Sequence, residues 1–101
     1  MRTESVTMVR LYLTEQDISV RELIETLQER EQLRGVTVWR GMAGYGKSGI
    51  IHSGGKLELN RDHPIVVEFF DKPEKIIQVL DDLQKLIESG HMVYWPATVC
   101  V

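Results

Sequence analysis

Two amphipathic segments, each lying between two strand patterns, limit most strongly the folds open to this chain. The first begins at Ser19, where Ser-Val-Arg-Glu forms a capping box, and Gly35 is expected to end it. The second begins at Asp71, the expected N-cap, has Pro73 in its first turn, and is expected to end at Gly90. Because each helix has one apolar face, each is expected to pack on a sheet.

Four stretches have the patterns of strands. They are expected at residues 5–13, 36–40, 65–70 and 91–101. The third is apolar except for Glu68, as in a central strand, whereas Pro96 removes a backbone donor from the last and places it at an edge or a bulge. The order β-α-β-β-α-β predicts an α+β fold, a ferredoxin-like sandwich with a four-stranded antiparallel sheet and a long loop after strand 2. Right-handed crossovers place the first and third strands in the middle.

Length and composition limit the number of domains, the class of ligand and the location in the cell. With 101 residues, the chain is expected to form a single domain spanning residues 1–101. A net charge of −3 argues against nucleic-acid binding through phosphate neutralisation. Cys100 is the one cysteine, so no internal disulfide can form, and a cytoplasmic location is expected. No apolar run approaches the ~18–20 residues that cross a bilayer, so we expect no direct membrane insertion.

The stretch 35–49, GVTVWRGMAGYGKSG, runs from a strand pattern into a glycine-rich loop. Residues 41–48 fit the phosphate-loop pattern GxxxxGK[ST], and residues 44–49 fit GxGxxG. Both motifs need a helix after the loop, yet the sequence that follows has no helical period. Three interpretations stay open: a phosphate-loop enzyme, a glycine loop that binds nothing, and an anion-binding loop in a different fold. We favour the third, because closely spaced glycines let backbone N–H groups converge on an anion.

The segment that follows, as far as residue 63, is a long loop with little predicted regular structure. Such loops in compact domains are usually functional or disordered. Its apolar residues Ile50 and Ile51, with His52 and Lys56, form a candidate surface for docking a partner. A short hairpin folded over the domain is an equally good interpretation.

One face of the expected sheet has nothing to cover it. Alternation along the strands places apolar and aromatic residues there: Met8, Tyr12, Trp39, Phe69 or Phe70, and Tyr94. An exposed apolar face of this size predicts self-association.

The arrangement resembles the PII signalling proteins, which are trimers of ferredoxin-like subunits with a long loop after the second strand. Their Gly-aromatic-Gly-basic element is matched by Gly44-Tyr45-Gly46-Lys47. GVTVWRGMAGYGKSGIIHS followed by HPIVVEFFDKPEKI is more closely similar to a PII-like family of unknown function, domain of unknown function 190. The resemblance implies a cytoplasmic regulator, a homotrimer, that binds adenine nucleotide at clefts between subunits. It also implies a partner that is a membrane transporter or channel, reached through the long loop (the T-loop).

The candidate ligand-binding residues combine the glycine loop with the turn before the last strand. They are Gly41, Gly44, Tyr45, Gly46, Lys47, Ser48, Gly49, Gly90 and His91. Lys47 would place its charge on a phosphate, and the backbone N–H groups of residues 44–49 would form the cradle. The turn at 88–91 is short and the last strand has no Lys or Arg. Among AMP, ADP and ATP, the smaller nucleotides, or a small anion, are therefore favoured over the triphosphate.

Other chemistry is not indicated. The three histidines lack the spacing of metal ligands, so no metal site is expected. No nucleophile lies beside a base, so no catalytic residue is named and the chain is not expected to be an enzyme. The alternative is a small nucleotide-binding hydrolase that uses the GxxxxGKS-like loop.

Overall fold

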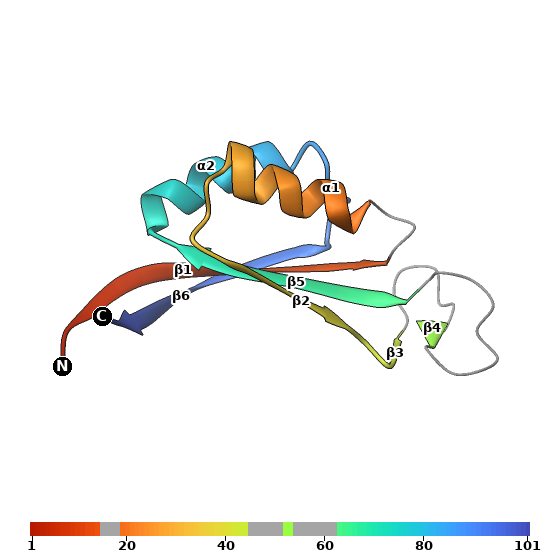
Figure 1. Cartoon of the computed structure of the whole chain (residues 1–101), viewed down its shortest axis with the longest axis horizontal. Helices are drawn as coiled ribbons and strands as arrows, with labels where there is room; N and C mark the ends of the chain where they lie inside the picture. Colours follow the sequence, from red (N-terminus) through yellow and green to blue (C-terminus); the bar gives the residue numbers. More distant parts are fainter. Residues whose placement is uncertain (15–18, 45–51, 54–62) are drawn as a thin grey trace.

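The structure is a computed structural model, and it describes residues 1–14, 19–44, 52–53 and 63–101. Figure 1 shows the elements in chain order: β1 (Thr3–Thr14), α1 (Val20–Glu25), the π-helix η1 (Thr26–Arg30), β2 (Val36–Arg40), β3 (Ala43–Gly44), β4 (His52–Ser53), β5 (Pro64–Asp71), α2 (Pro73–Leu83) and β6 (Met92–Cys100).

The main sheet has four strands in the order β2-β5-β1-β6, and every neighbouring pair is antiparallel. The first and third strands of the predicted fold, β1 and β5, are therefore central, and β6 with its Pro96 is an edge strand, as the sequence indicates. α1, η1 and α2 lie on one face of this sheet (Figure 1). The ferredoxin-like α+β fold is confirmed. Within the described residues, no helix is both long and apolar enough to span a bilayer.

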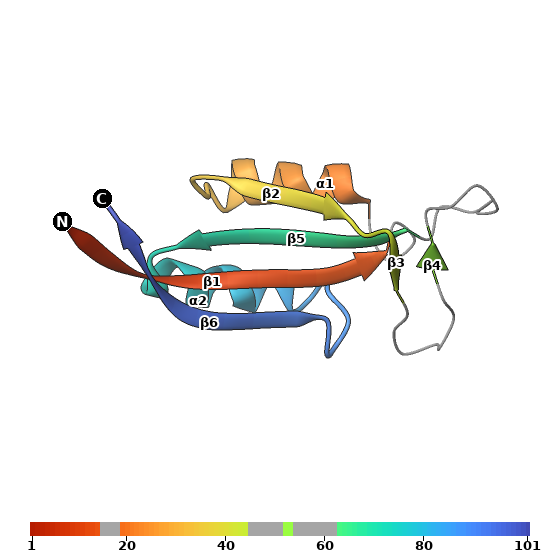
Figure 2. The same ribbon diagram turned by 90° about the horizontal axis from the view of Figure 1, so that it is seen from below.

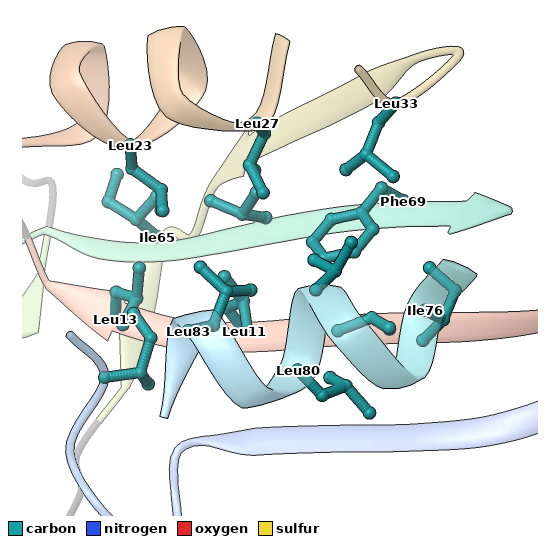
Figure 3. Packing of buried hydrophobic residues seen from close by; sticks show 14 residues of the cluster. Leu11, Leu13, Leu23, Leu27, Leu33, Ile65, Phe69, Ile76, Leu80 and Leu83 are labelled. Carbon is teal, nitrogen blue, oxygen red and sulfur yellow. The ribbon is translucent and has the colours of Figure 1, made fainter. Parts of the chain in front are cut away.

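The core lies between the sheet and the helices (Figure 3). Every second residue of β1 points into it, and Val9, Leu11 and Leu13 are buried as the alternation predicts. β5 supplies the residues directly opposite, among them Phe69, which is buried beside Val9. Phe70 therefore lies on the other face. From the helices the core receives Leu23, Leu27, Ile76, Val79, Leu80 and Leu83.

The second face of the sheet, viewed directly in Figure 2, is covered by no described element. We call it the open face. By strand register it carries Met8, Arg10, Tyr12, Thr37, Trp39, Val66, Glu68, Phe70, Val93 and Trp95. Tyr12 and Trp39 are each 46% exposed, so large apolar surface faces solvent in a single copy of the chain.

The start of α1 agrees with the sequence, but its end does not. Ser19 is the N-cap, and its Oγ accepts a hydrogen bond from the backbone N–H of Glu22 at 3.3 Å. The helical segment ends before Gly35, because Gln32 takes the left-handed backbone conformation (φ 55°) that a glycine was expected to supply. This early turn lets Leu33 reach the core, where it is 8% exposed.

α2 also differs at both ends from the prediction. Its N-cap is Lys72 rather than Asp71. Asp71 is the buried last residue of β5, and its Oδ1 accepts a hydrogen bond from the Lys72 N–H at 2.8 Å while Oδ2 forms an ion pair with Lys75 Nζ at 3.2 Å. Burial works to raise the pKa of Asp71, but these two contacts outweigh it and hold the pKa below its ordinary value. α2 ends at Leu83, and Gly90 lies in the turn beyond it.

An acidic pair links the end of η1 to α2. Glu31 follows η1 directly, and Asp82 lies in α2. Burial, together with the hydrogen bond and charge repulsion from Asp82, raises the pKa of Glu31 to about 7. At pH values below this pKa the two carboxyl groups share a proton. At pH values above it both are ionised and repel each other.

Stability should therefore fall as pH rises from about 4.5, the ordinary pKa of Glu31, to about 7, its value in the fold. Over this range the unfolded chain loses the proton and the folded chain keeps it, which costs at most about 3 kcal/mol of stability and less than this because water screens the exposed Asp82. Glu31→Gln should remove this component, because glutamine stays neutral and can still donate to Asp82. The measurement is urea unfolding at pH 5 and pH 8, with the exposed Glu29→Gln as control. Equal pH dependence in wild type and Glu31→Gln would contradict the prediction.

Candidate ligand-binding site

The predicted ligand-binding residues gather at one end of the main sheet. There β2 ends at Arg40, β1 ends at Thr14, β5 begins at Pro64 and β6 begins at Met92. β3 and β4 form a separate two-stranded ribbon next to this end (Figure 2). Of the candidates, Gly41, Gly44, Gly90, His91 and the backbone of His52 are described. Tyr45, Gly46, Lys47, Ser48, Gly49, Ile50, Ile51 and Lys56 lie outside the described residues.

Gly41 has a structural reason to be glycine. Its backbone N–H donates to the carbonyl oxygen of Pro64 at 2.7 Å, which continues the pairing of β2 with β5. A Cβ at this position would lie 2.8 Å from Pro64 Cγ, so the proline ring or the strand would have to shift to admit a side chain. The N–H of Gly41 is thus used inside the sheet, and the donors of the proposed cradle have to come from residues further along.

Gly44 pairs with His52 in the antiparallel β3–β4 ribbon. Lys47 therefore belongs to the connection between two paired strands. In a phosphate-loop enzyme a helix begins at the lysine and would run through positions 52 and 53. The structure has strand β4 there. The GxxxxGKS pattern thus includes strand β3, and strand β4 stands where the motif needs its helix, while residues 45–48 lie outside the described residues.

The second half of the candidate site is the turn before β6. Gly90 has φ 88°, a left-handed conformation that favours glycine although nothing lies within 4 Å of a Cβ built there. His91 is held against the end of β1, since its Nδ1 lies 2.9 Å from the carbonyl oxygen of Tyr12 and its own carbonyl accepts the Tyr12 N–H at 2.9 Å. A carbonyl can only accept, so Nδ1 carries the hydrogen. The other ring nitrogen, Nε2, lies 3.8 Å from Glu88 Oε2.

The two halves of the site lie at opposite edges of the sheet. Gly41 follows the edge strand β2, and His91 precedes the other edge strand, β6. β5 and β1 lie between them, so three strand spacings, roughly 14 Å, separate the two edges. Within one copy, the end of β2 at Gly41 and the turn at Gly90–His91 are therefore apart, and residues 45–49 of the glycine loop lie outside the described residues.

The open face contains a feature that sequence reasoning missed. Arg10 and Glu68 lie opposite each other on β1 and β5, and Arg10 Nε donates to Glu68 Oε2 at 2.9 Å. The sequence signal was present, because Arg10 and Glu68 are the only charged residues in the stretches 5–13 and 65–70 that the pattern predicts as strands. Hydrogen bonding to Tyr12 and Glu68 raises the pKa of the Arg10 guanidinium.

One assignment to the open face was wrong. Tyr94 pairs with the core residue Val9, so it lies on the helix side of β6, where it is 61% exposed. Its neighbour Trp95 pairs with Met8 and occupies the open face instead. The strand parity was read correctly from the sequence, but which parity faced the helices depended on the β1–β6 register. In the described ranges, no group of three His, Cys, Asp or Glu residues could hold a metal ion.

Comparison with known proteins agrees with this architecture. The family model DUF190, described as "Uncharacterized ACR, COG1993", matches residues 6–99. The chain belongs to the DUF190 family. A UPF0166 protein of Aquifex aeolicus is 33% identical over 89 residues, which cover 83% of this chain and 84% of that protein.

Solved structures show the same fold. CPII of Thiomonas intermedia K12, a nitrogen regulatory PII-like protein bound to ADP, AMP and bicarbonate, superposes with a TM-score of 0.70 at 20% identity, covering 99% of this chain and 91% of CPII. A putative PII-like signalling protein of Thermus thermophilus has a TM-score of 0.66 at 17% identity, covering 100% of this chain and 93% of its own. The DUF190 chain thus has the PII-like fold that the sequence indicates.

Replacing Gly41 by alanine should destabilise the DUF190 chain by about 1–3 kcal/mol, because the new Cβ would overlap the ring of Pro64. Gly44→Ala is the matched control, since a Cβ there would lie at an ordinary 3.6 Å from Pro64 and should change stability by less than about 1 kcal/mol. Urea unfolding of the two variants tests this. Equal stability of both would show that Pro64 does not limit position 41.

Proposed function

We propose that this protein is a PII-like regulator, not an enzyme, that binds an adenine nucleotide or a small anion in clefts between copies of the chain. One observation carries the proposal: Gly41 and the Gly90–His91 turn lie at the same end of the sheet but at its opposite edges, which supports a site formed by two copies. The bound ligands of CPII, ADP, AMP and bicarbonate, support the ligand class.

In the proposed cleft, one copy supplies the glycine loop and its neighbour supplies the turn with Gly90 and His91. Backbone N–H groups of residues 44–49 cradle a phosphate, and Lys47 adds a positive charge. His91 contributes Nε2, which accepts a hydrogen bond when neutral and donates one when protonated. The hydrogen bond from Nδ1 to Tyr12 holds the ring in place in either state.

The proposed output is docking of a partner through the long loop after β2. Ligand bound at the base of the loop would favour one loop arrangement, and Ile50, Ile51, His52 and Lys56 would contact the partner. We propose a cytoplasmic setting and a membrane transporter or channel as partner, and no role in nucleic-acid binding. Strand β4 gives no support to the alternative, a hydrolase with a phosphate loop.

Isothermal titration with AMP, ADP and ATP tests the ligand. Lys47→Ala should weaken nucleotide binding about 10- to 150-fold, because loss of a charged donor to phosphate costs about 1.5–3 kcal/mol. Lys56→Ala, which removes a charge from the docking part of the loop, is the matched control and should bind as wild type does. Binding of none of the three nucleotides would overturn the nucleotide proposal, and release of phosphate from bound ATP would favour the hydrolase.

Light scattering tests the assembly. The expected mass is three times that of the 11.6 kDa chain at micromolar concentration, because the open face needs a cover and the cleft needs a second copy. A monomer would remove the basis for a shared cleft. A dimer would keep self-association and contradict the PII-like trimer.

A further inference from the structure

The centre of the open face is polar, although its surroundings are apolar. Arg10 and Glu68 are directly opposite each other on the two central strands. The guanidinium makes two hydrogen bonds to the same carboxylate oxygen, from Nε at 2.9 Å and from Nη2 at a shorter distance. Met8, Val66, Phe70 and Val93 share this face by register.

Two tryptophans lie against the guanidinium of Arg10. The guanidinium carbon of Arg10 lies 5.9 Å from the ring centroid of Trp39 and 5.3 Å from that of Trp95. Trp39 comes from the edge strand β2 and Trp95 from the edge strand β6, so the cluster crosses the whole sheet. Both cation–π contacts strengthen when water is excluded, as do the hydrogen bonds between the charged groups.

On a surface that faces water, the Arg10–Glu68 pair contributes little to the stability of the fold. A solvent-exposed ion pair contributes about 0–1 kcal/mol to stability. The side chains of Arg10 and Glu68 are still 36% and 18% exposed, so water screens part of their attraction. The two charges cancel, so this face can be desolvated without leaving a net charge behind, which an unpaired arginine would not allow.

The pair also has unused capacity for hydrogen bonds. Both bonds from Arg10 end on Oε2 of Glu68, and among the described residues no donor reaches Oε1. Arg10 Nη1 donates only a long hydrogen bond, 3.5 Å, to the hydroxyl oxygen of Tyr12. A carboxylate oxygen that becomes buried needs a donor, so a partner that covers this face has to supply one.

We infer that the Arg10–Glu68 pair is the polar centre of an interface between copies of this chain, and that it selects the register and number of the copies. The inference rests on the self-association proposed above. A second copy fits because it brings the same arginine and Tyr12 hydroxyl as donors, and because the charges of the pair sum to zero and attract neither an acidic nor a basic partner.

The test is light scattering over a dilution series for wild type, Arg10→Met, Glu68→Gln and the double variant Arg10→Met/Glu68→Met. Each single change leaves one member of the pair without its full partner, so each should raise the concentration for half-assembly at least 10-fold. The double variant has no buried charge and should assemble at wild-type concentrations, but as a mixture of sizes, because the element that selects register is gone.

Matched controls make the result specific. Arg21→Met and Glu25→Gln remove the same groups from the exposed side of α1 and should assemble as wild type does. Arg10→Lys keeps the charge but loses the planar fork, so it should weaken assembly about 10-fold in a folded chain. Circular dichroism of each variant checks folding.

The outcomes separate this inference from the proposed function. Assembled wild type with single variants that assemble equally well would overturn this inference alone. A double variant with one defined size, equal to that of wild type, would overturn the selection of register. A monomeric wild type would overturn the proposed self-association and this inference with it.

Discussion

The structure depends on one constraint, the burial of one face of a four-stranded sheet under α1, η1 and α2. Every second residue of β1 and β5 points to these helices, and a slip of one residue in either strand would move its whole apolar set to the other face. Leu11, Leu23, Leu27 and Leu83 are almost completely inaccessible, and burial of each contributes roughly 2 kcal/mol. The register that results decides which residues lie on the open face and which segments follow the edge strands.

The same register creates the open face and sets what lies on it. It joins Arg10 to Glu68 across the central strands and brings Trp39 and Trp95 over them from the two edges. It also separates Gly41 from the turn that holds His91, because the strands next to these residues are the two edges of the sheet. The uncovered face and the separation of Gly41 from the Gly90–His91 turn thus have one origin, the order and register of the strands.

Local chemistry was predictable from the sequence where neighbours in the chain decide it. The capping box at Ser19 needs only residues within one turn, and the alternation in β1 needs only a strand with one buried face. The helix ends were less predictable. Asp71 has a side chain typical of an N-cap, yet it is buried at the end of β5 between Lys72 and Lys75, and the cap falls on Lys72. Gln32 turns the chain where Gly35 was expected to, because the early turn buries Leu33.

The sequence by itself determined the order of elements, the ferredoxin-like fold and the family, because these depend on periodicity, caps and motifs that neighbouring residues express. Only the tertiary structure decided which side of β6 carries Trp95, why Gly41 must be glycine and where Arg10 finds its counter-charge. Each of these rests on a pairing between strands distant in sequence: β6 with β1, β2 with β5, and β1 with β5. Register between such strands is set by packing of the whole sheet, and no single segment encodes it.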